Sequence, residues 1–541
     1  MIIHGFSTAL LLLSVIALLP LSSSLSTHPA RKVQFMVEDI KDVLGRSFDY
    51  IIVGGGTSGC SLAATLSKRY SVLLVERGGL PYGNPLIEER KNFSFSLLQT
   101  GPFRSISQQF ISKEGVVNHR GRVLGGSTAI NGGFYSRASE DYVLERGRWD
   151  PELVREAYEW AEAKMVFRPS LTSWQSVAAQ SMIEAGIRPF NGFSLEHLEG
   201  TKVGGSIFDA HGRRHTSADL LAAGNSKNIT VLLNATVQNI IFHDASCGEQ
   251  PRAHGIRFIR SNGNPKKLYE VYLNHPNVSG SWGDVILCAG ALGSPQILML
   301  SGIGPKEHLM HFNITPVVDA RAVGQSMQDN PAISIPLNYS PNSLQKLHPD
   351  PPQVVGIVDD FRIIMETSVF YPSLNTSILP VLAAKVAYPV SRGSLRLVSR
   401  DPRQNPSVKF NYLAEEKDLD ECVKMVLLIE KVAQSRSISV FLGRRQSRLS
   451  MDGKPIYLEL RDYCKKNVRT IYHYHGGCVV GSVVGRDYRV FGIDGLRVID
   501  GSTLRDSPGT NPMATLLMLG RYQGIKMLRE RERHDPSEPV E

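Results

Sequence analysis

Residues 48–76, FDYIIVGGGTSGCSLAATLSKRYSVLLVE, decide the fold of this chain. The run FDYIIV is short, apolar and rich in β-branched or aromatic residues, which predicts a buried strand over 48–53. A glycine-rich turn follows, then CSLAATLSKRY with helical spacing, then SVLLV as a second buried strand before Glu76. This order of strand, turn, helix and strand predicts a Rossmann-type α/β unit that binds a dinucleotide.

The glycines of this turn have separate expected roles. Gly54 permits the tight turn, Gly56 lets a pyrophosphate approach the backbone, and Gly59 lets the helix pack closely on the strand. The N-terminus of the helix would face the negative charge of the phosphates. Glu76 closes the second strand, where its carboxylate would accept hydrogen bonds from a ribose.

Composition narrows the class of protein. The chain has 541 residues, of which 42% are hydrophobic and 21% charged, so disordered and fibrous classes are excluded. The net charge is +9, but the basic residues are scattered among 51 acidic ones, and we expect no nucleic-acid partner. At about 150 residues per domain, the length allows several domains.

The N-terminus reads as a targeting segment. Residues 9–21, ALLLLSVIALLPL, form an apolar run that is shorter than a membrane span, and we predict a signal peptide over residues 1–26. A retained anchor is the alternative. We expect a secreted, extracellular protein with no membrane contact after cleavage, and seven Asn-x-Ser/Thr sites are compatible with glycosylation. Because a flavin can be bound before export and kept, FAD is the expected dinucleotide.

The six cysteines form no CxxC pair and no cluster with histidines, so we expect no metal site. Cys60 and Cys288 lie in apolar, glycine-flanked segments and are predicted to be buried free thiols. Cys422 and Cys464 lie in helical, charged contexts, where a disulfide could join two parts of the C-terminal half.

Further glycine-rich segments carry a family resemblance. They are GRVLGGSTAINGGFYSRA (121–138), GALGSPQILMLSGIGP (290–305), GQSMQDNP (324–331), YHYHGG (472–477) and IDGSTLRDSPGTNPMAT (499–515). On these stretches the chain resembles the glucose-methanol-choline (GMC) family of FAD oxidoreductases. Within that family it is most similar to the plant branch of mandelonitrile lyase-like and Hothead-type proteins.

The resemblance implies an α/β fold of two interwoven domains. The FAD-binding, Rossmann-type domain would combine residues 48–145, 201–330 and 465–530, the last with the catalytic residues. An α+β substrate domain with an antiparallel sheet would combine residues 146–200 and 331–464, where RGSLRLVS and FNYL suggest strands and DLDECVKMVLLIEKVAQ a helix. The charged residues 531–541 are expected to be a disordered tail. In the plant lyases the cysteines matching Cys422 and Cys464 form a disulfide.

Matching motif positions also implies a cofactor site. The expected contacts are Gly54, Gly56, Thr57, Ser58, Gly59, Glu76, Arg77, Val123, Ser127, Asn131, Gly132, Gly133, Phe134, Val237, Tyr472, His473, Asp500, Gly501, Pro512 and Met513. The histidine nearest to the 121–138 loop is His119, whose register differs from that of relatives with a covalent flavin. We therefore expect FAD to be bound noncovalently.

His473 and Asn511 are the predicted catalytic residues. By its flanking residues, His473 matches the histidine that the family uses at the flavin face, and a neutral imidazole can accept a proton at mild pH. Asn511 stands where relatives carry His or Asn, and it can hydrogen-bond a substrate oxygen but cannot exchange a proton. His475 is expected to pack or to form hydrogen bonds. The apolar helix after Pro512 is expected to point its N-terminus at the flavin ring.

Two activities compete for this site. In the first, a small-molecule alcohol, such as a long-chain or aromatic primary alcohol, is oxidised, with His473 taking the hydroxyl proton while hydride passes to flavin N5 and Asn511 holds the forming alkoxide. In the second, a cyanohydrin is cleaved by a hydroxynitrile lyase that uses FAD without redox change. The mandelonitrile lyases carry a histidine at the position of Asn511 and a tyrosine at that of Ile471, so oxidation is favoured. A catalytically silent flavoprotein is a third possibility. We expect a monomer, and no motif in the middle region identifies the substrate.

Overall fold

The computed structural model describes residues 35–101, 105–243, 250–275, 283–373, 376–446 and 456–533. The predicted signal peptide lies outside the described residues, as do Cys247 and residues 534–541. Among the helices that the structure describes, none is both long and apolar enough to cross a bilayer.

A parallel sheet of six strands carries the predicted Rossmann unit. Its strand order is β1-β11-β4-β3-β15-β26, and every neighbouring pair is parallel. The strands come from separate parts of the chain: β1 (Met36–Val37), β3 (Tyr50–Val53), β4 (Val72–Val75), β11 (Ile229–Leu232), β15 (Asp284–Leu287) and β26 (Leu496–Val498). Nearly all of these strand residues are buried, as expected for a parallel sheet covered on both faces. Segments far apart in sequence therefore build one layer.

The first predicted strand, 48–53, is divided at Asp49. β2 (Ser47–Phe48) joins a separate sheet of order β12-β13-β14-β2, whereas β3 joins the parallel sheet. The carboxylate of Asp49 accepts hydrogen bonds from the backbone N–H and the hydroxyl of Ser71, at 2.9 and 2.7 Å. This local bonding interrupts the run, which the apolar pattern alone did not reveal. The predicted helix is α1 (Thr57–Leu66), which ends before residues 67–70.

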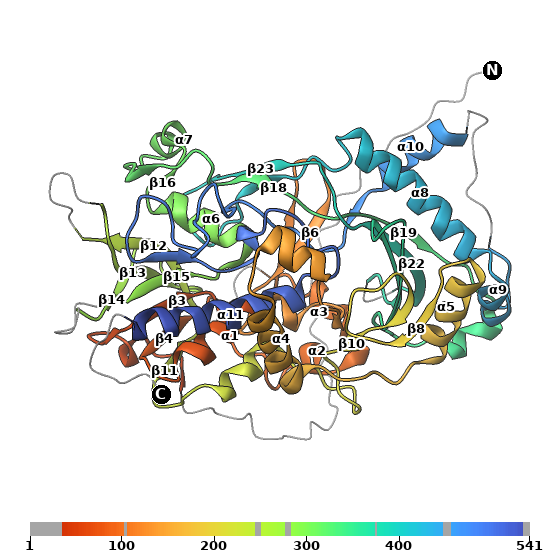
Figure 1. The fold of residues 1–541 in the computed structure, drawn as a ribbon, viewed down its shortest axis with the longest axis horizontal. Coiled ribbons are helices and arrows are strands. Elements are labelled where there is room, and N and C mark those ends of the chain that lie inside the picture. Colours follow the sequence, from red (N-terminus) through yellow and green to blue (C-terminus); the bar gives the residue numbers. More distant parts are fainter. Residues whose placement is uncertain are drawn as a thin grey trace, which may run out of the picture. The chain divides into compact units, whose positions relative to one another are not determined.

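Helix α1 packs against the long C-terminal helix α11 (Met513–Glu532). Figure 1 shows the blue α11 alongside α1. Two glycines allow this close approach: a Cβ on Gly520 would lie 2.2 Å from the carbonyl oxygen of Ser58, and one on Gly524 would lie 2.8 Å from Cβ of Thr65. The helix extends through Glu532, so residues 531 and 532 are helical where a disordered tail was expected. Arg531 pairs with Asp49 at 3.3 Å and lies over the ring of Tyr70, contacts that a count of charges cannot reveal.

A second, seven-stranded sheet has the order β25-β19-β22-β21-β20-β9-β8 and is antiparallel except for its β8–β9 pair. Its strands are β8 (Phe190–Phe193), β9 (Gly200–Val203), β19 (Pro331–Pro336), β20 (Val354–Val358), β21 (Ile363–Phe370), β22 (Leu379–Val386) and β25 (Arg469–Thr470). Helices α5 (Ser173–Glu184) and α8 (Glu416–Ala433) share an apolar cluster with one face of this sheet. Successive side chains alternate between faces, so residues such as Met365 and Leu382 meet the helices while Glu366 and Ala383 line the cavity on the other face. The predicted combination of an α/β unit and an antiparallel sheet is confirmed.

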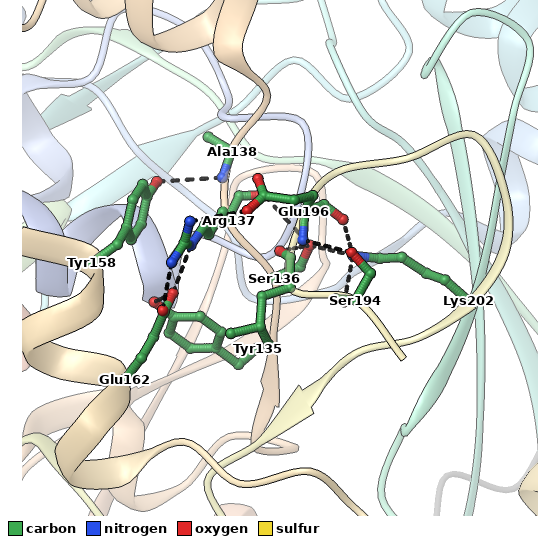
Figure 2. A network of polar contacts seen from close by, with 10 residues as sticks. Tyr135, Ser136, Arg137, Ala138, Tyr158, Glu162, Ser194, Glu196 and Lys202 are labelled. Carbon is green, nitrogen blue, oxygen red and sulfur yellow. Dashed lines mark hydrogen bonds and ion pairs between the residues drawn. The ribbon is translucent and has the colours of Figure 1, made fainter. Parts of the chain in front are cut away.

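A buried polar network links β9 to helix α4 (Pro151–Met165) and to the segment after β7 (Phe134–Tyr135) (Figure 2). Lys202 of β9 donates from Nζ to the hydroxyl of Ser136 at 2.8 Å and to the carbonyl oxygen of Ser194 at 3.2 Å. Arg137 forms an ion pair with Glu162 of α4 at 2.6 Å. Burial lowers the pKa of Lys202 to about 7. The network joins the seven-stranded sheet to a helix that packs on α11.

The cysteines that the structure describes agree with the predictions. Cys422 in α8 and Cys464 in α10 (Ile456–Asn467) form a disulfide with a Cα–Cα distance of 6.2 Å. Cys60 and Cys288 are buried and free, as is Cys478. No cluster of potential metal ligands occurs among the described residues.

The remaining elements complete the fold, and some of them contribute residues to a cavity. Helices are α2 (Pro85–Glu88), α3 (Phe95–Leu98), α6 (Gly290–Leu300), α7 (Lys306–His311) and α9 (Arg436–Leu442). Strands are β5 (Ser107–Ile111), β6 (Val117–Gly121), β10 (Gly205–Ser206), β12 (Ala235–Phe242), β13 (Ala253–Arg260), β14 (Tyr269–Leu273), β16 (Ile303–Gly304), β17 (Val318–Asp319), β18 (Gln325–Met327), β23 (Gly393–Arg396) and β24 (Ser407–Lys409). The expected helix 418–434 and a strand in RGSLRLVS are observed, but FNYL is not a strand because Asn411 and Leu413 have positive φ.

Candidate active site

A cavity of about 610 Å³ lies between the glycine-rich loop of the parallel sheet and one face of the seven-stranded sheet. The predicted site residues that line it are Gly54, Gly56, Thr57, Ser58, Glu76, Arg77, Ser127, Asn131, Gly132, Gly133, Phe134, Val237, Tyr472, His473, Asp500, Gly501, Asn511, Pro512 and Met513. Gly59 and Val123 are not among the lining residues. Gly59 is buried in α1, and Val123 forms a backbone bridge with Gly79. Segments from across the whole chain thus meet at one cavity.

The glycine-rich loop has the geometry that a pyrophosphate requires. Gly54 adopts a φ of 108°, and a Cβ there would lie 2.4 Å from the carbonyl oxygen of Cys288. A Cβ on Gly59 would lie 2.0 Å from the carbonyl oxygen of Gly54, so helix α1 starts directly on the strand end. A Cβ on Gly56 would meet no atom closer than 3.9 Å, which leaves its backbone open to a ligand at the helix N-terminus.

Glu76 is fixed at the end of β4 by the backbone. Its carboxylate oxygens accept hydrogen bonds from the N–H of Gly55 at 2.9 Å and of Gly78 at 2.8 Å. Burial raises the pKa of Glu76, while Arg77 and these N–H donors lower it. Each oxygen keeps a further lone pair, so the carboxylate can still accept a hydrogen bond from a ribose in the cavity.

His473 is held by the strand β25 that precedes it and by Asp329. The carboxylate of Asp329 accepts the backbone N–H of His473 at 3.1 Å and the hydroxyls of Thr470 and Tyr412 at 2.6 and 2.5 Å. Burial raises the pKa of Asp329 to about 6, and these donors lower it. Tyr472 has a φ of 63°, a backbone conformation that non-glycine residues rarely adopt and that occurs at functional sites. The strained turn directs His473 into the cavity wall.

The ring of His473 has a lysine as its neighbour on the far side. Lys385 of β22 places Nζ 3.1 Å from Nδ1 of His473 and donates to the carbonyl oxygen of Thr510 at 3.0 Å. Because Nδ1 is engaged, Nε2 is the ring nitrogen left for a substrate. Burial, then Lys385, then His475 lower the pKa of His473 well below its usual value, so the imidazole is neutral at mild pH.

Asn511 lies beside the N-terminus of α11, with Pro512 at the N-cap position. Its side chain hydrogen-bonds Glu366, while its own Oδ1 is buried and has no partner in the structure. A buried acceptor without a partner is costly, so it marks a place where a ligand can donate. Asn511, Pro512 and Met513 all line the cavity, and α11 has no side-chain cap, so its first N–H groups are free to face a ligand.

His475 and His119 have different environments. The ring nitrogens of His475 contact the carbonyl oxygen of His473 at 3.0 Å and Oε1 of Gln328 at 3.1 Å, which confirms the predicted hydrogen-bonding role. His119 lines the cavity with its ring 5.9 Å from that of Tyr472, and its buried Nδ1 has no partner. Burial lowers the pKa of His119.

Sequence reasoning missed three charged residues near His473, of which Asp329 and Lys385 are buried and Glu366 is half-buried. Asp329 lies inside the quoted stretch GQSMQDNP, but no role was assigned to it. Glu366 and Lys385 lie in strands with the sequences IIMETSVF and LPVLAAKV. A single charged residue within an apolar strand is the signal that could have found each of them, since such residues are seldom fully buried without a reason.

Comparisons with known proteins agree with this geometry. The family models for the N- and C-terminal parts of GMC oxidoreductases match residues 48–332 and 389–520. The chain is 44% identical over 517 residues to an (R)-mandelonitrile lyase-like protein of Arabidopsis thaliana, with 90% of each chain covered. It is 42% identical to the protein HOTHEAD of the same plant, covering 90% of this chain and 89% of that one. It is 40% identical to sinalpyl alcohol oxidase Nec3 of Nesocodon mauritianus, with 90% of each covered.

Among solved structures, a formate oxidase of Aspergillus oryzae, studied for FAD modification, matches with a TM-score of 0.76 and 20% identity. The match covers 91% of this chain and all of the other. The open backbone at Gly56, the acid at the end of β4 and the uncapped α11 also fit the pyrophosphate, ribose and flavin of FAD. The chain therefore belongs to the GMC oxidoreductase family, and its cofactor is FAD.

Proposed function

We propose that this protein oxidises the CH–OH group of an alcohol, with His473 as the general base. FAD, when bound, would supply the two-electron acceptor for the hydride of the carbinol carbon. Nε2 of His473 accepts the hydroxyl proton, and Asn511 orients the substrate oxygen by donating the Nδ2–H that Glu366 does not use. We further propose that the protein acts after export and removal of its signal peptide.

The observation that carries this proposal is the pairing of His473 with Asn511 on the cavity that the glycine-rich loop also lines. Oxidation needs one group that accepts a proton and one that holds an oxygen, and this pair supplies both. Phe93, Leu97 and Phe370 line the same cavity, which supports a substrate with an apolar or aromatic group next to its carbinol carbon. The likeness to an alcohol oxidase is in line with that choice.

A hydroxynitrile lyase is the second candidate, favoured by the likeness to a mandelonitrile lyase-like protein. Cyanohydrin cleavage requires a proton for the departing cyanide. The residues that would deliver it in the lyases are Asn511 and Ile471 here, and both line the cavity. An amide is a far weaker acid than an imidazolium, and an isoleucine side chain has no proton to give. Lyase activity is therefore the less favoured function.

The test is to mix the purified, yellow protein with a panel of aliphatic and aromatic alcohols without oxygen and to record the flavin absorbance band. We expect at least one apolar primary alcohol to bleach the band and to be recovered as its aldehyde. An unchanged band with every alcohol, together with benzaldehyde release from mandelonitrile, would replace oxidation by the lyase reaction. An unchanged band without either product would leave a catalytically silent flavoprotein.

A further inference from the structure

Lys385 and Glu366 occupy neighbouring positions on the face of the seven-stranded sheet that meets the cavity. Strands β21 and β22 are antiparallel, with Ile364 opposite Lys385 and Glu366 opposite Ala383. Glu366 and Lys385 are thus diagonal neighbours on one face of the sheet. Glu366 lines the cavity, whereas Lys385 lies behind His473 and is completely shielded from solvent. The pair places an amine against the imidazole of His473 and a carboxylate near that amine.

The hydrogen bond between Lys385 and Nδ1 decides what His473 can do at Nε2. When Nζ is an ammonium it must donate, so Nδ1 is the acceptor and the ring proton lies on Nε2. In that state His473 donates a hydrogen bond into the cavity and cannot take a proton there. When Nζ is a neutral amine it can accept from Nδ1–H, and Nε2 then carries a lone pair. Only this second state is a general base toward a substrate hydroxyl.

We propose that Lys385 receives a proton through His473 during alcohol oxidation and that Glu366 stabilises the ammonium formed. This inference rests on the proposed function. The substrate O–H bond breaks and an Nε2–H bond forms, while the Nδ1–H bond breaks and an Nζ–H bond forms; the hydride goes to FAD. His473 stays neutral at the end of the step, and its Nε2–H donates to the carbonyl oxygen of the product.

The electrostatics of the cluster support this exchange. Burial lowers the pKa of Lys385 to about 7, opposed by the carboxylates of Glu366 and then Asp329. Burial raises the pKa of Glu366, opposed by Lys385 and by the hydrogen bond from Asn511. A buried imidazolium at His473 is disfavoured, so the amine behind it is the better final acceptor. The other titratable groups facing this cluster are His475 and His197, whose pKa values Lys385 helps to lower.

Lys202 shows what a buried lysine without this role looks like. It is as fully buried as Lys385, and its pKa is lowered to a similar value. Its ammonium contacts a hydroxyl and backbone carbonyl oxygens, none of which changes protonation in this pH range. Lys385 differs because one of its partners is the imidazole of His473, and this makes Lys202 a matched control.

The experiment compares holoenzymes carrying Lys385→Arg, Lys385→Gln, Glu366→Gln or Lys202→Met. The rate of flavin bleaching by a reactive alcohol is followed from pH 5.5 to 9.5, and the absorbance of the oxidised flavin is titrated over the same range without substrate. Arginine keeps the charge but cannot release a proton, so we expect at least a 100-fold slower bleaching. Glutamine can accept a hydrogen bond from Nδ1–H, which keeps His473 in its basic tautomer, but it cannot take up the proton. Its bleaching should therefore be slowed by about 10-fold, which is less than in Lys385→Arg.

The pH dependence separates proton exchange from mere packing. In the wild type, bleaching should rise with pH through a limb near pH 7, because neutral Lys385 is required, and the flavin absorbance should titrate at the same pH. The rise of the bleaching rate near pH 7 and the titration of the flavin absorbance should both be absent in Lys385→Arg and Lys385→Gln and present in Lys202→Met. In Glu366→Gln both should move to lower pH, because this variant loses the negative charge that favours the ammonium of Lys385. A flavin titration that persists in both Lys385 variants would overturn the inference, as would equal slowing of both variants.

The proposed function and this inference fail in different ways. If no alcohol bleaches the wild-type flavin, the proposed function is wrong. The proton transfer through His473 to Lys385, here called the relay, needs that reaction and is then wrong as well. If the wild type is bleached and Lys385→Arg is bleached with the same pH profile, alcohol oxidation stands and the relay alone is rejected. If Lys385→Arg loses its bound flavin, the pH profile of Lys385→Gln, which has the shorter side chain, decides whether the relay is rejected.

Discussion

The two parts of the cavity are built in different ways. Around Gly54 and Gly56 the wall is backbone from one continuous stretch, with Gly59 packed behind it, and its shape depends on the absence of side chains at these glycines. Around His473 the wall is made of side chains from β21, β22, β25 and the segments before β19 and α11, and what matters is how buried charges balance. The nucleotide part is local and preformed, whereas the histidine part is assembled by tertiary contacts.

This difference predicts how each part responds to change. A side chain added in the glycine loop would clash with neighbouring backbone. Substitutions there should therefore remove the cofactor and leave the properties of the residues around His473 unaltered. Substitutions among the charged side chains around His473 change the electrostatic balance of that cluster. They should leave the cofactor in place and change the rate of alcohol oxidation and its pH dependence. The variants below test this contrast, beginning with the largest expected effect.

Gly59→Ala should abolish flavin binding. The added Cβ would lie 2.0 Å from the carbonyl oxygen of Gly54 and 3.1 Å from Cβ of Cys288, so α1 would have to move away from the strand end. That movement destroys the phosphate cradle at the helix N-terminus. The measurement is the ratio of flavin to protein after purification, with Gly101→Ala as a control at an exposed position without a positive φ, where the nearest atom to the added Cβ is Cβ of Ser105 at 4.0 Å. A yellow Gly59→Ala protein would show that the loop tolerates displacement.

His473→Ala should slow alcohol oxidation by about 10² to 10⁴-fold while leaving flavin content unchanged, since general-base catalysis contributes about that much. Only the side chain is removed, and the backbone N–H that Asp329 accepts is retained. Stopped-flow bleaching measures the rate, and the absorbance ratio measures the flavin. Near-normal bleaching would remove His473 from the mechanism, and loss of flavin would erase the contrast between the two parts of the cavity.

Removing the disulfide should loosen the histidine part of the cavity and not the nucleotide part. Cys464 lies in α10, which ends at Asn467 just before β25 and His473, and its bond to Cys422 closes a loop with a sequence separation of 42. A disulfide that closes a loop of that size adds about 4 kcal/mol to the free energy of unfolding, because it restricts the unfolded chain. In the double variant Cys422→Ser/Cys464→Ser, hydrogen exchange should increase over residues 456–473. Equal protection in both proteins would contradict this expectation.

The nucleotide part of the cavity could be predicted from the sequence more fully than the part around His473. The glycine loop, Glu76 and α1 were predictable because their determinants lie within one stretch of residues 48–76 and act through local backbone geometry. The motif around His473 and Asn511 could be found by family resemblance. The exact strand boundary at Asp49 could not, because it depends on Ser71, which the turn brings back to it.

Lys385 and Glu366 could not be predicted as partners. Each is a single charged residue in an apolar strand, and only the register of β21 against β22 makes them neighbours. That register is a tertiary property, set by packing of the opposite face on α5 and α8. The boundaries expected for the two domains stay a prediction, although residues 469–470, assigned to the FAD-binding part, pair with β19 of the seven-stranded sheet.

The smallest effect concerns Lys202, which isolates burial from catalysis. Its pKa of about 7 in the folded protein is below the ordinary value of 10.5, so between pH 7 and 10.5 the unfolded chain binds more protons and stability should rise with pH. The slope for one such group approaches about 1.4 kcal/mol per pH unit. Lys202→Met should flatten this rise without moving the pH profile of flavin bleaching. Urea unfolding of both proteins at pH 7.5 and 9.5 measures the difference, in which contributions from Lys385 cancel. Parallel changes with pH would mean that the Ser136 and Ser194 contacts keep the ammonium as stable as it is in water.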